Sequence, residues 1–245
     1  MSITRKDLES LFLRTAKARL DTTKFDAIIK GKSEIVYHLN QGQKKLFSKA
    51  RILTATRSVP IVVQQNQYLY TDIVPTLGSG QQAFLIERVD WSDNIRSNRR
   101  VDGPFRYEDV AGRYVKYWVG LVPLMFGYRP PAGNAVPQPV FAIWPPPAQI
   151  SNATLTVEWR LLPQDLLHDY STPDSALAEQ WQELIAFWAV WRAALTIGES
   201  EDVADKLIDA LAKPEMAEMM AYYNVDNNLP PAMFFDDAYA ARYYP

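Results

Sequence analysis

Residue types that often mark a catalytic or disulfide-bonded protein are missing from this sequence or rare in it. There is no cysteine, which excludes a disulfide scaffold, a cysteine-based zinc site and a cysteine nucleophile, and removes any need for an oxidising compartment. The two histidines, His38 and His168, do not stand in an H-x-x-H or H-E-x-x-H motif, so no helical metal site built on histidine is predicted. We expect both histidines to be structural or solvent-facing, and we expect neither a metal ion nor a cofactor.

Long apolar runs and nucleotide-binding motifs are absent as well. The longest apolar run, residues 184–191, is too short to cross a bilayer. The first ten residues, MSITRKDLES, are charged and lack the apolar region of a signal peptide, so we expect no membrane partner. No G-x-x-x-x-G-K-[ST], G-x-G-x-x-G or G-x-S-x-G motif occurs. The acids at 108–109 and 199–202 fit the first turns of helices better than a catalytic dyad, so the sequence predicts no enzymatic activity.

Charge is distributed unevenly along the chain, although the net charge is only −2. Residues 1–60 hold 13 Lys and Arg against 5 Asp and Glu, a net charge of +8, whereas residues 161–245 hold 4 against 15, a net charge of −11. A basic front and an acidic back can pair within one chain or in head-to-tail contacts between copies. The basic segment 96–106 lacks a nucleic-acid recognition motif, which favours a solvated loop or a protein-binding surface over phosphate binding.

The first third of the chain has helical periodicity and the middle has strand composition. A helix is predicted over 3–19, with Thr4 as N-cap and Asp7 completing a capping box. A second helix is predicted over 32–53, with Ser33 as its cap and Gly42 as a weak point. The following strand candidates are rich in β-branched and aromatic residues. They cover residues 58–74, 82–91, 140–147 and 153–163, and the chain between 103 and 139 is expected to be irregular, with a short helix opened by Pro104.

Helical periodicity returns after residue 163. Thr172 as N-cap and Pro173 at the first position predict the start of a long helix, which Gly198 ends. Its tryptophans at 181, 188 and 191 share one broad face and are predicted to lie in the core. Another helix is predicted from Ser200 to about residue 213, and Pro214 is predicted to start a further short one.

These elements define an α+β chain. We predict N-terminal and C-terminal helices that form a helical bundle (residues 1–53 and 163–223), an inserted β-rich domain (54–162), and an extended C-terminal arm (224–245).

The ordered set of segments resembles the head-to-tail adaptor proteins of tailed bacteriophages. LNQGQKKLFSKARIL is similar to the family's helix that leads into the β-rich insert, and AFLIERVDWSD to the strand that follows. The family's run of strand, proline turn, strand and exit is similar to VFAIWPPPAQISNATLTVEWRLLPQDL. Its long helix is similar to STPDSALAEQWQELIAFWAVWRAAL.

The resemblance implies a structural virion protein. Such adaptors form rings, usually of twelve copies, on the portal protein, extend the DNA channel, and present a surface to the next tail or nozzle protein. Packaged DNA passes through without sequence-specific binding, and no enzymatic activity is expected. The resemblance places the protein in the neck of the virion, after assembly in the host cytoplasm. Another ring-forming neck component, such as a stopper or tail-completion protein, is an alternative, as is an enzyme with a β-sandwich substrate module.

The last residues, MFFDDAYAARYYP, are unusually aromatic for a chain terminus. Asn224 to Pro231 has the composition of a linker. The resemblance implies an arm that runs along the portal and becomes ordered only on binding, and the alternative is that the segment folds back onto its own helices. The residues predicted to dock on the portal are Phe234, Phe235, Asp236, Asp237, Tyr239, Arg242, Tyr243 and Tyr244.

Overall fold

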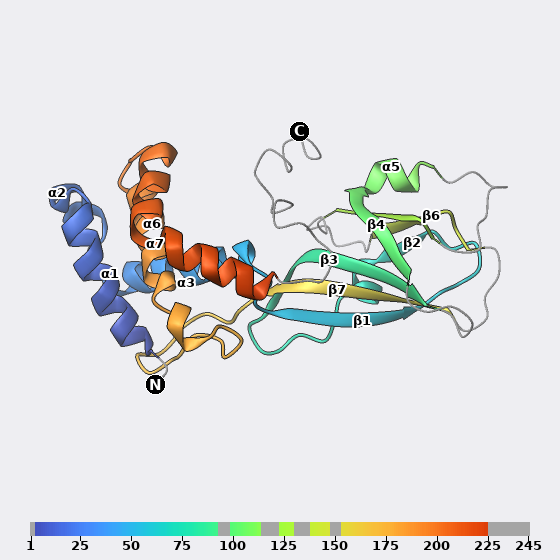
Figure 1. The fold of residues 1–245 in the computed structure, drawn as a ribbon, viewed down its shortest axis with the longest axis horizontal. Coiled ribbons are helices and arrows are strands. Elements are labelled where there is room, and N and C mark those ends of the chain that lie inside the picture. Colours follow the sequence, from blue (N-terminus) through green and yellow to red (C-terminus); the bar gives the residue numbers. More distant parts are fainter. Residues whose placement is uncertain (1–2, 93–98, 114–122, 130–137, 148–152, 225–245) are drawn as a thin grey trace. The chain divides into compact units, whose positions relative to one another are not determined.

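The computed structural model describes residues 3–92, 99–113, 123–129, 138–147 and 153–224 (Figure 1). They form a mixed α+β fold, as predicted from the sequence. By their internal contacts the described residues divide into two compact units. The helical unit holds the described residues of 1–53, 79–82 and 161–224, and the β unit holds those of 54–78 and 83–160.

The helical unit is built from segments of both chain ends. Within it, α3 packs most extensively on α6, which also contacts α1 and α7. A short 3₁₀ turn, Glu179–Trp181, precedes α6. The helices are α1 (Arg5–Arg19), α2 (Thr22–Ile28), α3 (Lys32–Lys49), α6 (Leu184–Thr196) and α7 (Glu201–Tyr223).

Helix α1 begins with the capping box that the sequence predicts. The Thr4 hydroxyl accepts a hydrogen bond from the Asp7 amide at 3.3 Å, and the Asp7 carboxylate accepts one from the Thr4 amide at 3.0 Å. Leu8, Phe12 and Ala16 recur at helical spacing and are fully buried. The next helix, α2, was not predicted; Asp21 caps it by accepting hydrogen bonds from two amides of its first turn.

One expectation for α3 is wrong and another is incomplete. Its N-cap is Gly31 and not Ser33. The Glu34 carboxylate, in the first turn of the helix, accepts hydrogen bonds from the amides of Gly31 and Lys30, both at 2.7 Å, so these two amides are satisfied without a side-chain cap. Gly42 is a contact point and not merely a weak point. A Cβ atom there would lie 2.5 Å from the backbone oxygen of Ile185 in α6, so glycine lets the two helix backbones approach closely.

The long helix predicted from Thr172 begins twelve residues later, at Leu184 in α6. Tertiary contacts hold the intervening backbone in turns. The Tyr223 hydroxyl accepts the Ala178 amide and donates to the Ala176 carbonyl, both at 2.7 Å. These groups are thereby satisfied without a helix. The end at Gly198 is confirmed: Gly198 has φ +89°, and the amides of residues 198 and 199 bond back to Leu195 and Ala194, as in a Schellman motif.

Helix α7 runs without interruption through Pro214, so the expected break into two helices is wrong. Pro214 and Ala210, whose carbonyl loses its helical partner, are both exposed, and water can satisfy that carbonyl. The predicted core position of the three tryptophans is confirmed, since Trp181, Trp188 and Trp191 are at most 8% exposed.

The β unit is a curled sheet with strand order β1-β7-β3-β4-β5-β6-β2. The pairs β1–β7, β3–β4, β5–β6 and β6–β2 are antiparallel, and the pair β4–β5 is parallel. The strands and short helices are β1 (Thr54–Pro60), β2 (Gln67–Leu69), α4 (Tyr70–Ile73), β3 (Gln82–Ser92), β4 (Arg99–Arg106), α5 (Tyr107–Ala111), β5 (Met125–Tyr128), β6 (Pro139–Trp144) and β7 (Thr154–Leu162).

Trp159 of β7 lies at the centre of the β unit. Its indole N–H donates to the Ile73 carbonyl at 2.8 Å, and its ring meets those of Tyr70 and Tyr128 edge-on at 5.8 and 5.3 Å. Tyr70 and Ile73 belong to α4. Tyr128 belongs to β5, which is separated from β7 by β3 and β4 in the strand order. The sheet therefore curls around this side chain.

Three strand predictions are confirmed, as β3, β6 and β7. The continuous strand predicted over 58–74 is wrong, since that stretch holds the end of β1, the three-residue β2 and α4. Pro104 lies in β4, and the short helix starts at Tyr107. The expected irregular region contains β4 up to Arg106 and the strand β5, whose Gly127 is close-packed on the backbone of Arg106.

Candidate interaction surfaces

In the part of the chain that the structure describes, no group of three or more His, Asp or Glu side chains could hold a metal ion. Helices long and apolar enough to cross a membrane are likewise not found there. What the described residues do offer are charged helix faces and exposed aromatic side chains.

The two histidines have different surroundings. His38 of α3 is 2% exposed and stacks on Phe12 of α1 at 6.2 Å. Burial, with a contribution from the Arg192 charge, lowers its pKa to about 4, and Glu34 opposes this only in part. His38 is therefore neutral at pH 7 and serves packing. His168 lies in an exposed turn and stacks on Tyr170 at 5.5 Å.

Part of the opposite charge at the two chain ends is used within the helical unit. Lys44 pairs with Asp165 at 2.8 Å, and Lys24 with Glu199 at 3.7 Å. Asp169 binds both Arg5 and Lys32, the latter at 2.6 Å. Intramolecular pairing, one of the two options left open by the sequence, thus occurs at several positions.

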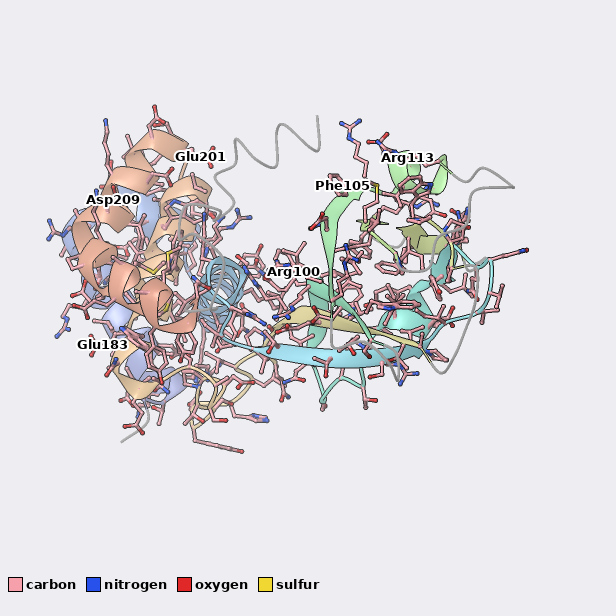
Figure 2. The ribbon with its side chains drawn as sticks, turned by 45° about the vertical axis from the view of Figure 1, so that its right-hand side comes forward. Arg100, Phe105, Arg113, Glu183, Glu201 and Asp209 are labelled. Carbon is pink, nitrogen blue, oxygen red and sulfur yellow. The ribbon has the colours of Figure 1, made fainter. Side chains whose placement is uncertain are left out.

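Other charges of the helical unit face solvent without an ion pair to any described residue. On α1 they include Lys6, Arg14 and Lys17, which lie on the face opposite the buried Leu8 and Phe12, together with the acid Asp7. On α7 and just before α6 the exposed charges are mainly acidic. Figure 2 labels Glu183, Glu201 and Asp209. Glu183 and, on α7, Glu201, Asp202, Asp205, Glu215 and Glu218 are exposed and form no ion pair with a described residue.

A four-residue turn, residues 168–171, holds Tyr170 in solvent, and we name it the Tyr170 turn. The His168 amide donates to the Ser171 hydroxyl, and the Ser171 amide to the His168 carbonyl, both at 2.9 Å. The amides of Arg5 and Lys6 donate to its carbonyls at 2.7 and 3.1 Å. The turn therefore satisfies donors at the start of α1. Sequence reasoning missed this site, because LLHDY is an exit loop without any recognised motif.

In the β unit, the basic segment 96–106 is described from Arg99 onward. Arg99 and Arg100 are exposed at the start of β4, and Arg100 lies opposite Asp90 of β3 in the register (Figure 2). Phe105, also labelled there, is partly buried and packs against Tyr107 and Val110. From Arg99 to Arg106, the described part of the segment, these contacts define a charged strand end and provide no aromatic platform for nucleic-acid bases.

The predicted docking residues fall outside the residues that the structure describes. The stretch 225–245 contains all of them, so their role stays a prediction from the sequence. They are Phe234, Phe235, Asp236, Asp237, Tyr239, Arg242, Tyr243 and Tyr244.

The fold and its surfaces define an α+β protein whose described surface carries charged helix faces and exposed aromatic side chains. Comparison with protein families identifies the group: residues 10–232 match the model of the SU10 adaptor protein. The chain belongs to this family of phage head-to-tail adaptors, which are structural components of the virion. No match was found among curated proteins. The family match ends at residue 232, just before the aromatic segment 233–245.

Proposed function

We propose that the protein forms a ring of identical subunits on the portal protein, extends the DNA channel and joins the capsid to the tail. The observation that carries this proposal is the match of residues 10–232 to the adaptor family. Twelve copies is the number we expect, and DNA passes through the ring without sequence-specific contacts.

The charge distribution supports a ring. Three exposed cations of α1 (Lys6, Arg14 and Lys17) and most exposed acids of α7 form no ion pair with a described residue; Asp209, which pairs with Lys213, is an exception. Two different, complementary faces on one subunit favour a heterologous contact, and heterologous contacts close into rings when their rotation allows.

We further propose that residues 225–245 dock on the portal. The proposal is based on the sequence: a linker-like stretch is followed by five aromatic side chains among Asp236, Asp237 and Arg242. Burying one such ring in a partner contributes about 1.5–3 kcal/mol before ordering costs. In a ring, many arms act together through effective concentration.

The test is reconstitution on portal-bearing heads that lack this protein. The full chain and a variant ending at Asn224 are added in parallel, and bound protein is quantified after sedimentation of the heads. We expect the truncated variant to keep its helical circular dichroism, because α7 ends at Tyr223, and to lose head binding. Unchanged binding, or unfolding of the truncated variant, contradicts the docking arm.

The alternative is a stopper or tail-completion protein, which would sit further from the portal. The family match favours the adaptor. Imaging of the reconstituted heads separates the two, because an adaptor binds heads that carry portal alone, whereas a stopper requires a preceding neck component.

A further inference from the structure

The Tyr170 turn presents the most exposed of the large hydrophobic side chains in the described structure. Tyr170 is 77% exposed and Leu167 beside it is 59% exposed. An open groove separates these residues from the start of α3, where Ser33 and Val36 line it. Exposed apolar groups gathered around a groove mark contact sites between proteins, and tyrosine is enriched among residues that dominate binding energy.

The turn is already ordered before any partner binds. Two hydrogen bonds close it, two amides of α1 anchor it, and the Asp169 carboxylate is bound by Arg5 and Lys32. The ring of Tyr170 also stacks on His168. A side chain held in its binding position loses little conformational entropy on association, which favours a role as anchor.

Side chains of both charges surround the turn. Arg5 and Lys32 both bind the Asp169 carboxylate, and Arg5 also pairs with Glu9 at 3.4 Å. Lys6, whose backbone amide bonds to the turn, has its side chain exposed and forms no ion pair with a described residue. The site therefore has an aromatic ring at its centre and two exposed lysines, Lys6 and Lys32, among the charged groups at its rim.

A surface of the complementary kind lies on α7 of the same chain. Glu215, Glu218 and Tyr222 stand at positions i, i+3 and i+7, so they share one face of the helix. All three are exposed, Tyr222 to 65%, and its ring is supported by Trp181 at 5.0 Å. This α7 stripe combines two carboxylates without ion pairs in the described part with one exposed aromatic ring.

We propose that the Tyr170 turn of one copy docks on the α7 stripe of a second copy of this chain. Tyr170 and Leu167 contact Tyr222, while Lys6 and Lys32 face Glu215 and Glu218. The contact is heterologous, because the two surfaces belong to different elements. The first copy keeps a free α7 stripe and the second a free Tyr170 turn, so further copies can add. The inference rests on the proposed ring and specifies the surfaces that build it.

The absence of cysteine from the chain allows a direct test by cross-linking. A variant with both Leu167→Cys and Glu218→Cys is oxidised in solution at high protein concentration and after addition of portal-bearing heads. We expect a ladder of covalent oligomers from the double variant and none from either single variant. Dimers formed by a single variant would show that a surface contacts itself, and absence of the ladder under both conditions overturns the proposal.

Charge reversal gives an independent test of the pairing. Lys6→Glu and Glu218→Lys are each expected to weaken self-association, measured by analytical ultracentrifugation and by binding to heads. An equimolar mixture of the two variants should regain assembly, because opposite charges then meet again at every contact. If the mixture is no better than either variant alone, the two residues do not face each other.

The aromatic anchor is tested with matched variants. Tyr170→Ala should weaken self-association at least about tenfold, and Tyr170→Phe should have little effect. Phe84→Ala, at a 45% exposed aromatic of β3 in the other unit, is the control and should assemble normally. If symmetric rings form on the heads but the double cysteine variant gives no covalent ladder, only this inference is overturned. If no symmetric assembly forms at all, the proposed function itself is contradicted.

Discussion

Substitution of Gly42 tests the close packing of α3 on α6. In an isolated helix, Gly→Ala stabilises by about 0.8–1 kcal/mol. In this protein the added methyl group would lie 2.5 Å from the Ile185 oxygen and 2.7 Å from the Ala189 nitrogen, both backbone atoms of α6. Backbone cannot rotate away as a side chain can, so the two helices must separate.

The expected result is a net loss of stability. Overpacking of this kind costs about 1–3 kcal/mol, which exceeds the gain in helix propensity over most of that range. We predict that Gly42→Ala lowers the free energy of unfolding of the helical unit by up to about 2 kcal/mol. Gly42→Val should cost more, because its side chain is larger and β-branched.

The assay is denaturant and thermal unfolding followed by circular dichroism at 222 nm, which mainly reports the helices. Ser33→Ala, at an exposed site of the same helix, is the matched control and should change stability by less than about 0.5 kcal/mol. If Gly42→Ala is more stable than wild type, Gly42 is only a poor helix former, and the close-contact reasoning is refuted.

Two further predictions concern buried groups of the helical unit. Because the pKa of His38 falls to about 4 in the fold, acid favours the unfolded chain. The protonation of His38 does not reduce the free energy of unfolding above pH 6.5. Its effect grows as the pH falls toward 4, and below that pH it lowers the free energy of unfolding by about 3 kcal/mol. His38→Leu should flatten this part of the profile of unfolding free energy against pH. Tyr223→Phe should destabilise the unit by about 1–2 kcal/mol, because the Ala178 amide and the Ala176 carbonyl lose their shared partner.

Each of these has its own control. For His38, the difference between wild type and variant at each pH removes the contribution of carboxylates, and a constant difference from pH 7 to pH 4 contradicts the buried, neutral histidine. For Tyr223, the neighbouring Tyr222→Phe should be near neutral, since Tyr222 is exposed. Equal effects of the two substitutions would show that the hydroxyl bonds of Tyr223 contribute little.

Local signals predicted local structure well. The capping box of α1 and the glycine end of α6 depend on residues within a few positions of each other, and both are confirmed. The strand composition of β3, β6 and β7 was equally informative. The family, too, could be recognised from the order of such segments.

Long-range contacts account for several of the failures. Thr172 and Pro173 form a good helix start, but Tyr223, some fifty residues away, holds the following backbone in turns. Gly42 weakens a helix in isolation, yet here it accommodates the backbone of α6. The Tyr170 turn was missed for the same reason, since its order depends on amides and side chains of α1 and α3 that no local pattern predicts.

The central claim, that the protein forms a ring on the portal, is tested most directly by cryo-electron microscopy of portal-bearing heads to which the full chain has been added. Reconstruction of the portal vertex without imposed symmetry should show a closed ring of identical subunits seated on the portal, with a central channel. A single bound copy, or saturated heads whose portal vertex carries no additional density, would contradict the account.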